Sequence, residues 1–154
     1  MATNWSGLGI DLRSTATGDG AAMVGAADAL SLFTATDVGG QLQEIAKYIP
    51  IALADPGTGA AIPVTRSASV AITTAGAETN TLAAPSFIGQ KMILACTAYA
   101  GGDRVITSAV SLNQAGNTVM TIGAVGDAIV LEARTLAGSL QWLVTANDGT
   151  ALSS

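Results

Sequence analysis

The hydrophobic pattern of the chain is helical in one stretch and alternating in most of the rest. Between residues 36 and 49 the large apolar residues are spaced by four, three and four positions: Val38, Leu42, Ile45 and Ile49. This spacing places them along one side of a helix, as a seam that can pack on another helix. Thr36 or Asp37 can cap the first turn, and Pro50 ends the helix because it lacks an N–H. The sequence therefore predicts one short helix with an apolar side.

This helix needs a cover for its seam. Gly39 and Gly40 each weaken it by roughly 1 kcal/mol relative to alanine, and so short a helix is marginal alone in water. Two packing partners are possible for the seam: the helix packs on its own domain, or helices from several copies of the chain pack together.

The first 35 residues have the texture of an arm. Glycine interrupts them repeatedly, and alanine and threonine fill much of the remainder. Leu8, Ile10 and Leu12 alternate as a short strand does. Together with Trp5 they can anchor an extended segment in a groove or as an added strand. We therefore expect an extended N-terminal arm over residues 1–35.

The helix is followed by a stretch rich in turn-forming residues, A-D-P-G-T-G-A-A-I-P at positions 54–63. Two prolines and two glycines in ten residues are typical of a boundary. The expected organisation is thus an arm over 1–35, a short helix with a Pro/Gly linker over 36–63, and a β-domain over 64–154.

From Val64 onward the pattern has a period of two. The first apolar face of this region comprises Ala68, Val70 and Ile72. Residues 91–99 are apolar on both faces, which is typical of a central strand. In the loop before them, Phe87 and Ile88 are expected to point inward. Strands spaced by about ten residues with Gly, Asn and Asp turns predict a mainly β protein, an antiparallel β-sandwich or barrel-like domain.

Two later segments refine this expectation. Alternation within residues 127–135 makes Glu132 and Arg134 neighbours on a solvated face. In the last long strand, Trp142 is expected to close the core.

The composition favours an assembling protein. Hydrophobic residues make up 49% of the 154 residues and charged residues only 11%, and six aromatic residues are present. The core must therefore be built from Val, Ile, Leu and Ala. So few charges leave a poorly solvated surface, and such surfaces tend to be covered by partners.

The charge distribution argues against two classes of partner. The net charge is −5, and the six basic residues form no cluster. Binding to nucleic acid or to an anionic membrane surface needs a patch of Lys and Arg, so neither is expected. No apolar stretch approaches the length of a membrane span, and the first residues lack the pattern of a signal peptide.

Catalytic and metal-binding patterns are missing from the sequence. Without histidine there is no Ser-His-Asp or Cys-His site and no histidine metal ligand. Cys96, the single cysteine, lies in an apolar run and is expected to be buried. The carboxylates follow no calcium-loop pattern. We therefore expect no catalytic residue, metal or cofactor. An enzyme acting on glycans would need two of the carboxylates near turns to converge: Glu78, Asp103, Asp127 and Glu132.

Three segments, taken in order, resemble a known family. Residues 33–45 (F-T-A-T-D-V-G-G-Q-L-Q-E-I) resemble a segment of tailed-bacteriophage head-fibre and capsid decoration proteins. Residues 81–94 (T-L-A-A-P-S-F-I-G-Q-K-M-I-L) are similar to a segment of the β-domain of those proteins, in which a proline-containing loop leads to G-x-x-hydrophobic. The C-terminal part of that domain is similar to two further segments, A-V-G-D-A-I-V-L-E-A and Q-W-L-V-T-A-N-D-G-T. Gly39-Gly40, and Gln41 in place of a frequent alanine, depart from the family pattern.

The resemblance implies a virion structural protein, a homotrimer that cements the outer surface of a phage capsid. Under this reading the seam would face the three-fold axis or the capsid. The arm would grip the major capsid protein or a neighbouring subunit. Two other functions stay open. A receptor- or glycan-binding head-fibre or tail-fibre module would take a host surface glycan near Tyr99, and a small glycan-acting enzyme would need the paired carboxylates.

Overall fold

The computed structural model describes residues 33–35, 38–113 and 115–154. The chain divides into two units, residues 1–46 and 47–154, which are described separately. The predicted caps Thr36 and Asp37 lie outside the described residues. So do the four arm residues singled out above: Trp5, Leu8, Ile10 and Leu12.

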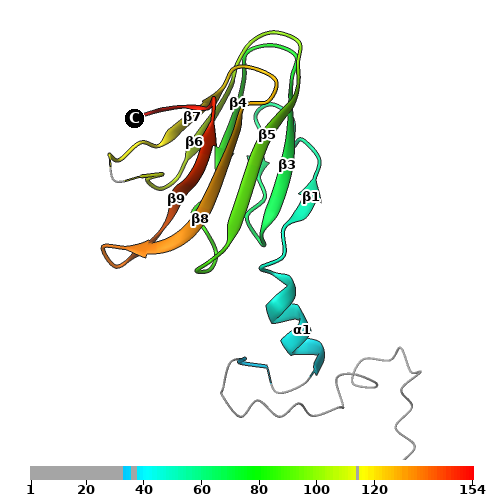
Figure 1. Cartoon of the computed structure of the whole chain (residues 1–154), viewed down its shortest axis with the longest axis vertical. Helices are drawn as coiled ribbons and strands as arrows, with labels where there is room; N and C mark the ends of the chain where they lie inside the picture. Colours follow the sequence, from blue (N-terminus) through cyan, green and yellow to red (C-terminus); the bar gives the residue numbers. More distant parts are fainter. Residues whose placement is uncertain (1–32, 36–37, 114) are drawn as a thin grey trace, which may run out of the picture. The chain divides into compact units, whose positions relative to one another are not determined.

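The first unit contributes helix α1, Val38–Ala46 (Figure 1). Its polar side holds the residues just before it: the Glu44 carboxylate accepts hydrogen bonds from the backbone N–H groups of Thr34 at 3.0 Å and Ala35 at 2.8 Å. The Gln41 side chain donates to the Ala35 carbonyl at 3.2 Å. None of the nine helical residues is buried.

The helix is shorter than the sequence predicted. We expected it to continue to Ile49, but it ends at Ala46 and Ile49 lies in the following bend. The cause is a non-local bond: the Lys47 carbonyl accepts a hydrogen bond from the backbone N–H of Ser67 at 2.9 Å. This bond and Pro50 commit the chain to the β-domain before another helical turn can form.

The second unit consists of two five-stranded sheets (Figure 1). The first sheet contains, in spatial order, β1 (Ile51–Leu53), β3 (Ala68–Thr74), β5 (Lys91–Tyr99), β8 (Ala128–Leu136) and β9 (Ser139–Asp148). The second contains β10 (Ala151–Ser153), β7 (Val119–Ile122), β6 (Arg104–Ser108), β4 (Glu78–Leu82) and β2 (Ala61–Ile62). The mainly β class with one short helix is confirmed, and β5 is central as expected.

The strand directions differ from the antiparallel expectation. The pairs β1–β3, β3–β5, β2–β4 and β4–β6 are parallel, while the pairs that involve β7 to β10 are antiparallel. The reason is connectivity. Strands β1 to β6 alternate between the two sheets, so each sheet receives every second strand, running the same way as the one before. Turn spacing alone does not distinguish this route from a series of hairpins.

The predicted linker also belongs to the β-domain. Both β1 and β2 fall within residues 50–63, and each lies at the edge of a sheet. Their core-facing residues include Ile62, which is 1% exposed. Residues 50–63 therefore supply one edge strand to each sheet, β1 just before the proline- and glycine-rich segment and β2 within it, and the β-domain begins well before Val64.

A single apolar core fills the space between the sheets. It contains the predicted faces of β3 and β8, namely Ala68, Val70, Ile72, Ile129, Leu131 and Ala133. Trp142 is fully buried, as expected, and its indole N–H donates to the Ala83 carbonyl at 2.9 Å. The loop prediction was wrong in one respect: Phe87 is half-buried, but Ile88 is 63% exposed.

The core also contains a charged cluster around Arg104, which is 1% exposed. Its guanidinium ion-pairs with Asp55 at 3.0 Å and with Glu78. It also donates to the Thr73 carbonyl at 2.6 Å and to the Asn80 side chain. One side chain of β6 thereby binds the β1–β2 loop, strand β3 of the first sheet and strand β4 of the second.

Asp55 holds the β1–β2 loop in this cluster. One of its oxygens accepts hydrogen bonds from the Thr73 backbone N–H at 2.7 Å and the Thr73 hydroxyl at 2.9 Å. The other accepts the Gly57 N–H at 2.9 Å. Burial acts to raise the pKa of Asp55, but these hydrogen bonds and the charge of Arg104 outweigh it and hold the pKa below its ordinary value. Asp55 is therefore present as a carboxylate.

We predict that Arg104→Met destabilises the protein by about 3–5 kcal/mol, because it leaves two carboxylates inside the domain without their counter-charge. The matched control is Arg134→Met. Arg134 pairs with Glu132 at 3.2 Å but its side chain is 54% exposed, so this change is expected to cost within about 0.5 kcal/mol. Urea unfolding measures both. Equal losses for the two variants would contradict the structural role of the buried cluster.

Candidate interaction surfaces

The apolar seam of α1 is open to solvent over much of its area. Leu42 is 59% exposed and Ile45 is 44% exposed, while Val38 is half-buried. The flanking positions of the seam carry Gly39, Gln41 and Ala46, none of which is charged. A helix with this surface can pack against another apolar surface without burying a charge.

A second apolar surface lies at the start of the β-domain. We call it the Tyr48 patch; it comprises Lys47, Tyr48, Ile49, Phe87 and Ile88. The Tyr48 and Phe87 rings pack edge to face, with centroids 5.0 Å apart at 82°. The Lys47 ammonium lies 5.3 Å from the centre of one ring and 5.2 Å from the other. Tyr48, Ile49 and Ile88 remain 46%, 59% and 63% exposed.

The turn after Ile88 supports the patch. Gly89 has φ of +78°, a conformation that strains residues with a side chain, and a Cβ there would lie 3.5 Å from the Tyr48 ring. The Gly89 N–H donates to the Ala133 carbonyl at 2.9 Å, which fixes the turn on β8. Sequence reasoning missed this patch, because its two short segments lie far apart in the chain.

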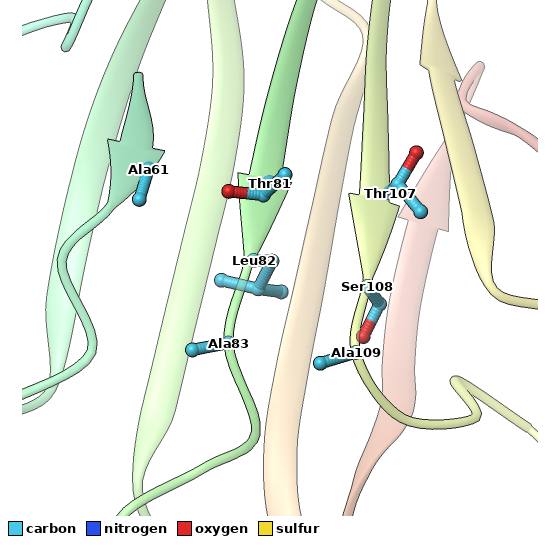
Figure 2. Close-up of a pocket in the computed structure, with 7 residues that line it drawn as sticks. All are labelled: Ala61, Thr81, Leu82, Ala83, Thr107, Ser108 and Ala109. Atoms are coloured by element: carbon cyan, nitrogen blue, oxygen red, sulfur yellow. The ribbon is translucent and has the colours of Figure 1, made fainter. Parts of the chain in front are cut away.

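The outer face of the second sheet is a third surface, and it is uncharged. Its outward residues are Ala61, Thr79, Thr81, Val105, Thr107, Val119, Thr121, Ala151 and Ser153. A shallow hollow of about 340 Å³ opens across β2, β4 and β6, where Figure 2 shows Leu82 among smaller alanine, serine and threonine side chains. Its lining carries no ionisable group, so it offers no acid, base or metal ligand.

The last residue of β5 is an exposed aromatic residue. Tyr99 is 36% exposed, and its hydroxyl donates to the Asp103 carboxylate at 3.3 Å. Gly102 shapes the turn: its φ is +77°, and a Cβ there would meet the Gly76–Ala77 backbone at 2.2 Å. Partial burial, and then the charge and hydrogen bond of Asp103, raise the pKa of Tyr99. The phenol is thus held as a hydrogen-bond donor.

The four carboxylates named for catalysis are each engaged in local structure. Glu78 pairs with Arg104, and Glu132 pairs with Arg134. Asp103 accepts the Tyr99 hydroxyl, and Asp127 accepts the N–H groups of Gly123 and Ala124 at 2.8 and 2.9 Å. Asp55 and Glu78 do converge, but on a buried guanidinium that neutralises them.

The remaining candidate groups offer no reactive centre. Cys96 is 4% exposed, and burial raises the pKa of its thiol, which favours the less nucleophilic protonated form. Within the part of the chain that the structure describes, no three His, Cys, Asp or Glu side chains gather as metal ligands. In the same part of the chain no helix has the length and apolarity to cross a bilayer.

No family model matches this chain, and no curated protein matches it. Function must therefore be argued from the surfaces themselves. Two of them, the α1 seam and the Tyr48 patch, expose large apolar side chains. The other two present small or aromatic groups.

We predict that Asp103→Asn lowers the pKa of Tyr99 towards its ordinary value, because it removes the nearby negative charge. The chain has two tyrosines, so the Tyr48→Phe background isolates Tyr99. Ultraviolet absorbance of the tyrosinate, followed as pH rises, measures the shift. An unchanged titration would show that Asp103 does not hold the phenol in solution.

Proposed function

We propose that this chain is a virion structural protein that decorates and cements the outer surface of a tailed-phage capsid as a homotrimer. Its work is burial. The α1 seam packs on copies of itself or on the capsid, and the N-terminal arm, with Trp5, Leu8, Ile10 and Leu12, contacts the major capsid protein or a neighbouring copy. Many copies then cover the seams between capsomers, and repeated contacts add avidity.

The observation that carries this proposal is the exposure of the α1 seam. Leu42 and Ile45 lie on one side of a helix that has no buried residue. A nine-residue helix with two glycines is unstable alone in water, so its persistence requires a partner surface. Full burial of each aliphatic side chain contributes roughly 1.5–3 kcal/mol.

The charge pattern supports association between like chains. The chain carries a net charge of −5, so copies repel one another wherever acidic surfaces meet. The seam and its flanking positions carry no charge, so contact there avoids that repulsion. The proposed role in the virion also rests on three segments that resemble phage head proteins and follow one another in the same order along the chain. The first of them contains most of α1.

A binding module is the second candidate, and Tyr99 favours it. An exposed aromatic ring with an anchored hydroxyl, at the end of a strand and beside a turn that requires glycine, is suited to stack on a sugar ring of a host surface glycan. Binding of host glycans that Tyr99→Ala abolishes, by a chain that does not associate with capsids, would select this function over cementing.

Replacing Leu42 and Ile45 with Asp is expected to convert the trimer into monomers, because three copies would then place six carboxylates in one seam. The control is Gln43→Asp, since Gln43 is exposed on the opposite side of the same helix. Light scattering during size-exclusion chromatography gives the mass of each variant. A trimer that survives the double substitution would contradict association through this seam.

We also predict that the chain co-purifies with virions at a copy number close to that of the major capsid protein.

Deleting residues 1–30 is expected to abolish binding to capsids. The deletion removes Trp5 and leaves Trp142 as the single tryptophan, so its fluorescence reports whether the core of the β-domain remains folded. Undiminished binding by a folded deletion variant would remove the arm from the mechanism.

A further inference from the structure

The α1 seam is too small to hold a trimer by itself. Nine helical residues span about 14 Å. Its three apolar side chains bury on the order of 100 Å² each, as deduced from their transfer free energies at about 25 cal/mol/Å². Together they supply roughly 300 Å², whereas a stable interface buries about 800 Å² per partner. An interface that uses the seam therefore needs more apolar surface.

The Tyr48 patch has the properties of that missing surface. In sequence it follows the seam directly, because α1 ends at Ala46 and residues 47–49 come next. It exposes three large apolar side chains of its own, and its members include no carboxylate. Lys47 is its one charge, and its ammonium lies over the Tyr48 and Phe87 rings of the same chain.

The patch is also preorganised. The edge-to-face packing of Tyr48 on Phe87, the position of Lys47 over both rings and the turn at Gly89 fix its shape before any partner binds. A surface whose side chains are already ordered loses less conformational entropy on association. Rigid aromatic residues of this kind commonly anchor protein interfaces.

We propose that the Tyr48 patch is a contact between copies of this chain, and that it forms the second part of the trimer interface. The occupant is a second copy, because the patch directly follows the proposed seam along the chain and supplies area that the seam lacks. This inference rests on the proposed trimer. It adds that the β-domain itself, and not α1 alone, takes part in holding the copies together.

The test compares Ile88→Lys with Val125→Lys in the full-length protein. Ile88 and Val125 are each 63% exposed, so the two changes place the same charge at equally solvated aliphatic positions. Only Ile88 belongs to the patch. Ile88→Lys is expected to raise the protein concentration at which the trimer half-dissociates by at least tenfold, and Val125→Lys to leave it within twofold. Sedimentation velocity over a dilution series gives this midpoint.

Each outcome decides the inference. A trimer unaffected by Ile88→Lys, yet dispersed by the Asp substitutions in α1, overturns the patch contact and leaves the trimer standing. Equal weakening by both Lys variants, or a wild-type chain that is monomeric, overturns it as well; the latter also removes the proposed trimer. Should Ile88→Lys lose the circular dichroism of the wild type, Ile49→Lys, at a position 59% exposed, takes its place under the same criteria.

Discussion

The guanidinium of Arg104 connects the two sheets of the β-domain through buried ion pairs and hydrogen bonds. It reaches from β6 into the core and binds groups from the β1–β2 loop and from both sheets. The short edge strands depend on it most. With three and two residues, β1 and β2 have few ladder hydrogen bonds of their own, and the loop between them is held by Asp55. Because a buried charge is tolerated only when it is paired, each partner in turn requires Arg104.

Local alternation predicted the inward and outward sides of individual strands, but not their neighbours. The faces of β3 and β8, the pairing of Glu132 with Arg134 and the burial of Trp142 all follow from a period of two and from residue size. Strand order does not. Alternate crossing between sheets produces parallel pairs, and the same turns would fit an antiparallel meander. The decisive partners are non-local: Asp55 and Arg104 are 49 residues apart, and Asp55 sits in a Pro/Gly segment that reads as a linker.

The surfaces show the same division. Spacing alone identified the seam of Val38, Leu42 and Ile45, because one helix contains it. The end of α1 depends on the bond between Lys47 and Ser67, which no local pattern reveals. The Tyr48 patch joins residues 47–49, which the sequence pattern assigned to the end of the helix, to residues 87–88, which it assigned to a loop. Ile88 was expected to point inward, whereas it is among the most exposed apolar residues of the described chain.

These features share one physical arrangement. The ion cluster of Arg104 is buried inside the β-domain, while the large apolar side chains of the α1 seam and the Tyr48 patch are exposed to solvent. Such a distribution suits a chain that completes its burial by joining others. Sedimentation equilibrium of the unmodified full-length protein across nanomolar to micromolar concentrations tests this most directly. We expect the mass of three chains at micromolar concentration and reversible dissociation on dilution. A single chain of 15.2 kDa throughout that range would contradict the account.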